Sequence, residues 1–138
     1  MNKEDRELVF RDLSARLPYG VRVKVRTKDG LIEEGVLDLA HNYGDVFLDA
    51  FYLNKIADIK PYLRPMSDMT DEERKEYYET MDKYTHRLYP DSADFSEHTE
   101  YSWKTETFDF LNANQLDYRG LIGKGLALRA SEGMYNIK

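Results

Sequence analysis

The stretch "VRVKVRTKDGLIEEGVLDLA", residues 21–40, carries the pattern that decides the fold. Valines alternate with basic residues at its start: Val21, Arg22, Val23, Lys24, Val25 and Arg26. A period of two gives a β-strand one apolar and one polar face. "KDG" at 28–30 predicts a hairpin turn, because Asp-Gly supplies the positive φ angles of a tight turn. "LIEEGVLDLA" is then the returning strand, and Gly35 within it predicts a bend or bulge.

The flanking segments extend this picture in both directions. Before the hairpin, apolar residues recur at helical spacing in "DRELVFRDLSARLPYG", which predicts an amphipathic helix ended by Pro18 and Gly20. After it, "DVFLDAFYL" (45–53) and "IADIKPYL" (56–63) are typical of further short strands. Pro61 and Pro65 then predict the end of the sheet.

The second half is expected to be helical. Thr70 and Glu73 have the spacing of a capping box, and an apolar stripe follows to residue 88. The stripe consists of Tyr77, Met81, Tyr84 and Leu88. We expect a loop at about 90–104, a short helix over 105–115, a further short helix capped by Asp117, and a last short strand in "LALRA".

Strands first and helices afterwards predict an α+β protein. We expect an N-terminal helix, a small SH3/Sm-like curled β-barrel and a helical C-terminal extension. The predicted domains are residues 1–65, with the helix and the barrel, and residues 66–138, with the extension packed on the barrel.

Composition narrows the functional classes. The chain has no cysteine, which excludes disulfides, thiolate metal sites and a cysteine nucleophile. Its first residues, "MNKEDRELVF", lack a signal-peptide core, and no apolar run approaches the roughly 20 residues of a membrane span. We therefore expect a cytoplasmic protein without membrane contact. The formal charge of −6 falls in residues 66–104, which disfavours nonspecific binding of nucleic acid by the whole surface.

The glycine-rich stretch "GLIGKG", residues 120–125, raises the question of phosphate binding. It lacks the spacing of a Walker A loop, the Ser or Thr after the lysine, and the dinucleotide pattern G-x-G-x-x-G. A G-x-x-G clamp of the KH type is the alternative. We favour a turn, in which Gly125 adopts the left-handed conformation and Leu121 and Ile122 pack inward.

Two groups of side chains are candidates for binding. The aromatic residues of the second half suit a protein-interaction surface, because Tyr and Trp are favoured at hot spots; the candidates are Tyr77, Tyr84, Tyr101 and Trp103. The basic strand residues Arg22, Lys24 and Arg26 would suit a phosphate backbone, or would form a solvated face that protects the strand edge from aggregation.

The three histidines do not indicate a metal site. His41, His86 and His98 lack the spacing of a helical zinc motif, so we expect no metal and no cofactor.

The segment "YGVRVKVRTKDGLIEEGVLDLAHN" resembles the first motif of Sm-like proteins: a leading helix, a glycine, an alternating strand, a K-x-G turn and a return strand with G-V-L. The resemblance implies a small barrel that binds RNA. Asp38 and Asn42 would occupy the RNA-binding loop, and His41 the base-stacking position.

A second resemblance covers nearly the whole chain. "IKPYLRPMSDMTDEE" with "FDFLNANQLDYRGLIGKGLALRASEGMY" is similar to an uncharacterised family of bacterial proteins, often carried on phage or mobile elements. It implies a bacterial context and supplies no catalytic residue.

Three functional hypotheses follow. The first is a non-enzymatic binding module whose partner is another protein, with no catalytic residues. The alternative is an Sm-like RNA-binding barrel that uses Arg22, Lys24, Arg26, Asp38, His41 and Asn42. The weaker alternative is a hydrolase with its site between the barrel and the loop around His98. Nothing in the sequence indicates whether the chain is a monomer or an oligomer.

Overall fold

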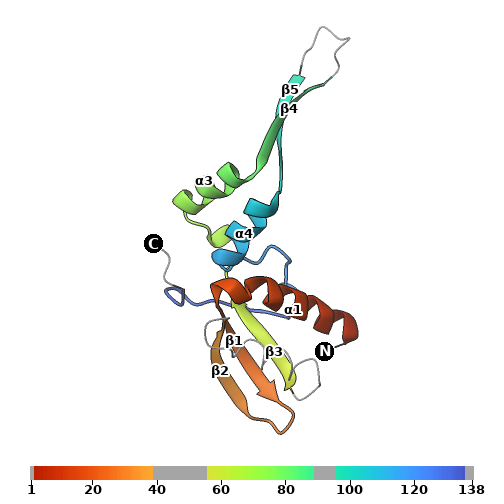
Figure 1. Ribbon diagram of the computed structural model, residues 1–138, viewed down its shortest axis with the longest axis vertical. Helices are drawn as coiled ribbons and strands as arrows, with labels where there is room; N and C mark the ends of the chain where they lie inside the picture. Colours follow the sequence, from red (N-terminus) through yellow and green to blue (C-terminus); the bar gives the residue numbers. More distant parts are fainter. Residues whose placement is uncertain (1, 39–55, 89–95, 136–138) are drawn as a thin grey trace. The chain divides into compact units, whose positions relative to one another are not determined.

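The structure is a computed structural model that describes residues 2–38, 56–88 and 96–135 (Figure 1). The chain divides into two compact units. Unit 1 comprises Met1–Asp68 and Asn112–Lys138, and unit 2 is the intervening segment Met69–Leu111. The described residues form three α-helices and six strands, so the α+β class is confirmed. The expected boundary after residue 65 lies close to the start of unit 2, whereas residues 112–138 group with unit 1.

Unit 1 begins with helix α1, Lys3–Arg16, which is the amphipathic helix that the sequence predicts. Asn2 caps it, since its Oδ1 accepts a hydrogen bond of 2.8 Å from the Asp5 backbone N–H. Pro18 ends the helix within a 3₁₀ turn, Leu17–Tyr19, and Gly20 follows at φ 77°. This left-handed glycine lets the chain reverse directly into the sheet.

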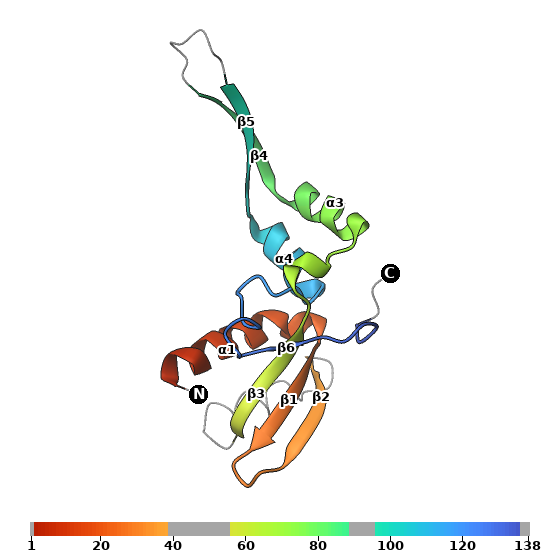
Figure 2. The ribbon, with the colours of Figure 1, turned by 180° about the vertical axis from the view of Figure 1, so that it is seen from behind.

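The sheet of unit 1 has the strand order β2-β1-β3-β6 (Figure 2). Strands β1 (Val21–Thr27) and β2 (Ile32–Leu37) form the predicted antiparallel hairpin. On its other side β1 pairs with antiparallel β3 (Ile56–Leu63), whose final residues pair in parallel with β6 (Leu128–Arg129). The bulge expected at Gly35 is wrong: the β1–β2 register runs through it, and the irregularity falls between Arg26 and Thr27, opposite β3.

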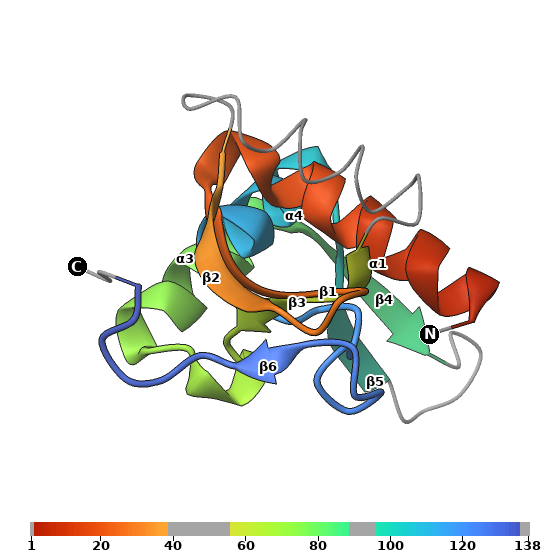
Figure 3. The same cartoon turned by 90° about the horizontal axis from the view of Figure 1, so that it is seen from below.

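Helix α1 covers one face of this sheet, here called the inner face (Figure 3). The alternation of β1 directs its three valines inward and its three basic residues outward. A core of twelve buried residues results, with members from α1, the three long strands and the C-terminal segment. They are Val9, Leu13, Leu17, Val21, Val23, Val25, Leu37, Ile59, Leu63, Leu121, Leu126 and Ala127.

The predicted curled β-barrel is not confirmed, because the sheet of the described residues is not closed into a barrel. The sheet is open there, with β2 at one edge and the two-residue strand β6 at the other. Closure would require hydrogen bonds between the two edge strands. Within the described ranges, α1 instead packs on the apolar face of the sheet and buries it.

Unit 2 contains helix α3 (Asp71–Thr80), strands β4 (Asp82–Leu88) and β5 (Ser96–Ser102), and helix α4 (Thr105–Ala113), of which the last residues count with unit 1. The capping box is confirmed: the Glu73 N–H donates to Thr70 Oγ1 and the Thr70 N–H to Glu73 Oε1. The expected helix to residue 88 is wrong, because Met81 is extended, with φ −91° and ψ 151°. β4 and β5 pair antiparallel, so part of the expected loop at 90–104 is a strand.

Arg64 holds together the two points where the chain leaves and re-enters unit 1. Its side chain is buried, and its Nη1 and Nη2 donate to the backbone oxygens of Asn114 and Asp68, each at 3.1 Å. Its backbone N–H donates to the oxygen of Gln115, and its own oxygen accepts from the N–H of Asp117, both at 2.8 Å. One residue thereby binds residues on both sides of the inserted unit 2.

Replacing Arg64 by methionine should lower the free energy of unfolding by about 3 kcal/mol, because two partly buried hydrogen bonds to backbone oxygens lose their charged donor. Urea denaturation followed by circular dichroism measures this. Arg129→Met is the matched control, since Arg129 also binds Asp68, at 3.0 Å, but its side chain is 65% exposed. That exposed pair should contribute less than about 1 kcal/mol. Equal losses in the two variants would contradict the role given to Arg64.

Candidate functional site

The glycine-rich stretch at 120–125 turns the chain, as the sequence predicts. Both carboxylate oxygens of Asp117 accept backbone hydrogen bonds, from Leu121 at 2.8 Å and from Ile122 at 3.0 Å. Gly120 and Gly125 adopt positive φ angles, and the Leu121 side chain is fully buried. The segment forms consecutive turns instead of the short helix expected there. A phosphate would need the N–H groups that Asp117 already occupies.

A buried charge network lies between α1 and the segment after α4. Arg16 binds Asp12 through Nε at 2.9 Å and Nη2 at 3.2 Å, and both side chains are fully buried. Arg16 Nη2 also donates to the oxygen of Leu116 at 2.7 Å. The Arg119 guanidinium lies 3.6 Å from Asp12 and 4.7 Å from the centre of the Tyr118 ring. The sequence alone did not predict this network. The i, i+4 spacing of Asp12 and Arg16 is the one local feature that indicates an ion pair there. Its partners are protein groups, so its role is structural.

Tyr135 fastens the C-terminal segment to the sheet. Its Oη accepts a hydrogen bond of 3.0 Å from the Arg22 backbone N–H and donates one of 2.7 Å to the Tyr62 oxygen. Burial raises the pKa of the Tyr135 hydroxyl to about 12. A shallow hollow of about 530 Å³ opens beside it and brings together Arg22 and Asp38, two residues of the predicted RNA-binding set.

The raised pKa of Tyr135 predicts a loss of stability at high pH. The unfolded chain loses this proton near its ordinary pKa of about 10, whereas the folded chain keeps it to about pH 12. The free energy of unfolding should therefore fall as pH rises through this window. Urea denaturation at several pH values should show a shallower fall for Tyr135→Phe than for the wild type. Tyr19→Phe, at a tyrosine that is 43% exposed, is the control and should keep the wild-type slope. A wild-type slope in Tyr135→Phe would contradict this assignment.

The described part of the predicted RNA-binding set lies on β1 and directly after β2. Arg22, Lys24 and Arg26 project from the exposed face of β1. The register places Lys60 of β3 opposite Lys24, which adds a fourth cation, but it also places Glu34 of β2 there. Asp38 is half-buried, whereas His41 and Asn42 lie outside the described residues.

Three of the four predicted aromatic residues, Tyr77, Tyr101 and Trp103, come together in unit 2. Six rings form a connected set, here called the aromatic cluster: Tyr77, Tyr78, Tyr101, Trp103, Phe108 and Phe110. Adjacent ring centres are separated by 5.1 Å for Tyr78–Tyr101, 5.3 Å for Trp103–Phe108 and 6.2 Å for Tyr77–Trp103. The backbone of Tyr84 lies in β4, and its side chain lies outside what the structure describes.

The cluster is assembled from three elements and remains open to solvent. α3 supplies Tyr77 and Tyr78, the β5 end supplies Tyr101 and Trp103, and α4 supplies the two phenylalanines. Four of the rings are exposed by 39–46%, those of Tyr78, Tyr101, Trp103 and Phe108. Burial raises the pKa of Tyr77, at the centre of the cluster. Phe108 and Phe110 were not predicted as members of the aromatic cluster, because helical spacing alone does not show which strand a helix will contact.

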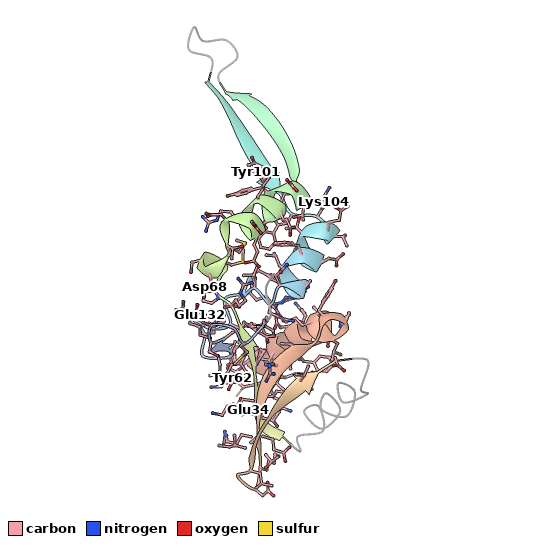
Figure 4. The ribbon with its side chains drawn as sticks, turned by 90° about the vertical axis from the view of Figure 1, so that its left-hand side faces the viewer. Glu34, Tyr62, Asp68, Tyr101, Lys104 and Glu132 are labelled. Carbon is pink, nitrogen blue, oxygen red and sulfur yellow. The ribbon has the colours of Figure 1, made fainter. Side chains whose placement is uncertain are left out.

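Hydrogen bonds fix the helix ends beside the cluster. The fully buried Thr107 hydroxyl accepts from the Lys104 N–H at 3.1 Å and donates to the Thr80 oxygen at 3.2 Å. The start of α4 is thereby fixed to the end of α3. Figure 4 labels Tyr101 and Lys104, which lie at the end of the hairpin and the start of α4. The aromatic cluster is thus built on hydrogen-bonded elements, although much of its surface is exposed.

The hydrolase hypothesis stays a prediction, because the side chain of His98 lies outside the described residues. No group of three His, Cys, Asp or Glu side chains with metal-binding geometry occurs among those residues. The strand register pairs His86 with His98 across the hairpin, which places their backbones and not their side chains.

Comparisons with family models, curated proteins and solved structures gave no match for this chain. The two resemblances noted in the sequence therefore stay predictions. None of the helices in the described ranges is long and apolar enough to cross a membrane.

Proposed function

We propose that this protein is a non-enzymatic interaction module that binds another protein through the aromatic cluster of unit 2. The observation that carries the proposal is the joint exposure of Tyr78, Tyr101, Trp103 and Phe108 by 39–46%. Aromatic side chains of a small folded unit normally serve as its buried core. Contiguous exposed apolar surface is typical of interaction sites, and Tyr and Trp are enriched among the residues that dominate binding energy.

The charge of unit 2 indicates the chemistry of the partner. Residues 69–111 hold twelve Asp/Glu and five Lys/Arg, a formal charge of −7, whereas the rest of the chain carries +1. A field of this sign attracts neutral or basic surfaces and repels polyanions. A protein with an apolar patch inside a basic surface therefore fits the aromatic cluster better than a nucleic acid does.

The other hypotheses have less support. RNA binding by Arg22, Lys24 and Arg26 stays a prediction, because acidic residues share that face of the sheet. Hydrolysis also stays a prediction, because the structure does not describe the side chain of His98, around which that site was expected. The absence of cysteine and the resemblance to bacterial proteins support a place in the bacterial cytoplasm.

Loss of the central rings should abolish partner binding while the fold persists. Immobilised wild type, Trp103→Ala and Tyr101→Ala should be compared for the proteins they enrich from a lysate of the cells that encode the chain, with quantification by mass spectrometry. Each substitution should lower enrichment of the true partner at least tenfold, since a hot-spot residue contributes about 2 kcal/mol or more. Tyr19→Ala is the matched control, because Tyr19 in unit 1 is 43% exposed, as Tyr101 is.

Trp103 also gives a test that needs no variant, since it is the only tryptophan of the chain. A partner seated on the aromatic cluster should shield its fluorescence from quenching by acrylamide. Circular dichroism should show that the variants remain folded. A partner that the variants retain, and that leaves Trp103 as accessible as before, would refute the proposal.

A further inference from the structure

The face of the unit 1 sheet that α1 does not cover, here called the outer face, has a pattern of its own. The strand register sets Ile32 opposite Arg26 and Glu34 opposite Lys24 on the β1–β2 side. On the β1–β3 side it sets Lys60 opposite Lys24, and Asp58 opposite Arg26. Residues directly opposite each other share a face, so these side chains lie together.

The acidic side chains of this face have partners, whereas two of its cations have no ion pair with any residue that the structure describes. The Tyr62 hydroxyl donates to Glu34 Oε1 at 2.5 Å, and Figure 4 shows the two side chains near each other. Asp58 lies 3.9 Å from Lys60 Nζ. Within the described ranges, Lys24 and Arg26 form no ion pair with any residue. Two neighbouring strand cations are thus available to an anion from outside the chain.

These cations line a shallow hollow of about 240 Å³ whose borders are partly apolar. Ile32 of β2 lies at one end and Leu128 of β6 at the other, with Lys24, Arg26, Asp58 and Lys60 between them. Ile32 is 59% exposed, so its aliphatic surface is accessible from solvent. The hollow therefore presents positive charge at its centre and aliphatic surface at its two ends.

The register gives the length of this hollow. β2 and β6 are three strand spacings apart in the sheet order, which is about 14 Å. Ile32 is level with Asp58, through Arg26, and Leu128 is level with Tyr62, four residues further along β3. Four residues of strand add about 13 Å, so the diagonal is about 19 Å, the length of about six extended residues.

We propose that this hollow binds an extended acidic segment of a partner protein, with carboxylates at its centre and an aliphatic side chain at each end. Arg26 and Lys24 would receive the carboxylates, and Ile32 and Leu128 would contact the aliphatic ends. RNA fits less well, because the described residues that line the hollow include no aromatic side chain for stacking of bases, and Asp58 and Glu34 repel a continuous phosphate backbone. This hollow lies in unit 1 and would bind an acidic segment, whereas the aromatic cluster lies in unit 2 and is proposed to bind a protein with a basic surface.

A defined peptide tests the proposal. The probe is a fluorescein-labelled peptide in which two leucines, six positions apart, flank a Glu-Asp-Glu centre, and binding is followed by fluorescence anisotropy. We expect saturable binding that weakens as salt is raised from low to moderate concentration. Replacing both leucines by serine should weaken binding at least fivefold, and replacing the acidic centre by lysines should abolish it.

Variants of the protein locate the binding site. Lys24→Glu and Arg26→Glu should each lower the affinity at least tenfold. Lys3→Glu makes the same change in net charge on the exposed first turn of α1, which covers the opposite face, and should leave the affinity unchanged. Circular dichroism should show the same fold in all three, as expected for exposed positions.

Three outcomes would overturn the proposal. The first is no binding of the acidic peptide at low salt. The second is equal loss in Lys3→Glu, which would show a general charge effect. The third is tighter binding of a labelled uridine-rich RNA than of the peptide, with the RNA lost in Lys24→Glu, which would assign the face to RNA. None of these outcomes bears on the aromatic cluster, which is tested in unit 2.

Discussion

Arg64 is the constraint on which the arrangement of unit 1 depends. The chain leaves this unit after Asp68 and returns at Asn112, so 43 residues separate two segments that must meet again. A long inserted segment adds loop-closure entropy, which rises slowly with length but opposes the return. The Arg64 side chain binds backbone oxygens on both sides of the insertion, and its backbone continues the pairing to Gln115 and Asp117. Because a guanidinium offers several fixed donors, one buried arginine can satisfy carbonyl groups from two segments at once.

The buried polar groups of unit 1 follow the same principle. Asp12 and Arg16 are fully buried, yet each has a charged partner, and Arg16 additionally binds the Leu116 oxygen. Burial of an isolated charge would oppose folding, whereas a paired and hydrogen-bonded charge is tolerated and gives directional contacts. The network therefore determines where the segment after α4 meets α1, a position that the aliphatic core alone would specify only loosely. The Tyr135 hydroxyl does the same for the C-terminal segment by binding backbone groups of β1 and β3.

The elements that could be predicted from the sequence are those with local causes. The alternation of 21–26, the Asp-Gly turn and the Thr70–Glu73 box all act within a few residues, and the hairpin and the helix start follow from them. Tyr77, Met81, Tyr84 and Leu88 also fit a helix by local spacing, but residues 82–88 pair with β5 instead. That pairing satisfies backbone groups through partners eight to twenty residues away in the sequence, so the local helical spacing could not reveal it. In the described residues the apolar face of the open sheet packs against α1, a contact that the strand pattern could not reveal either.

The candidate surfaces show the same division between local and distant causes. Composition alone identified Tyr77, Tyr101 and Trp103, but only the tertiary structure joins them to Phe108 and Phe110. The basic face of β1 was visible in the alternation, whereas its apolar borders, Ile32 and Leu128, come from strands on either side of β1 and β3. The two surfaces differ in chemistry: one is aromatic within an acidic unit, and the other is basic with aliphatic ends. Because specificity depends on rejecting the wrong partner as well as binding the right one, surfaces of opposite charge select different partners. Under the two proposals one chain would distinguish two ligands, and a substitution on one unit would leave binding by the other unchanged.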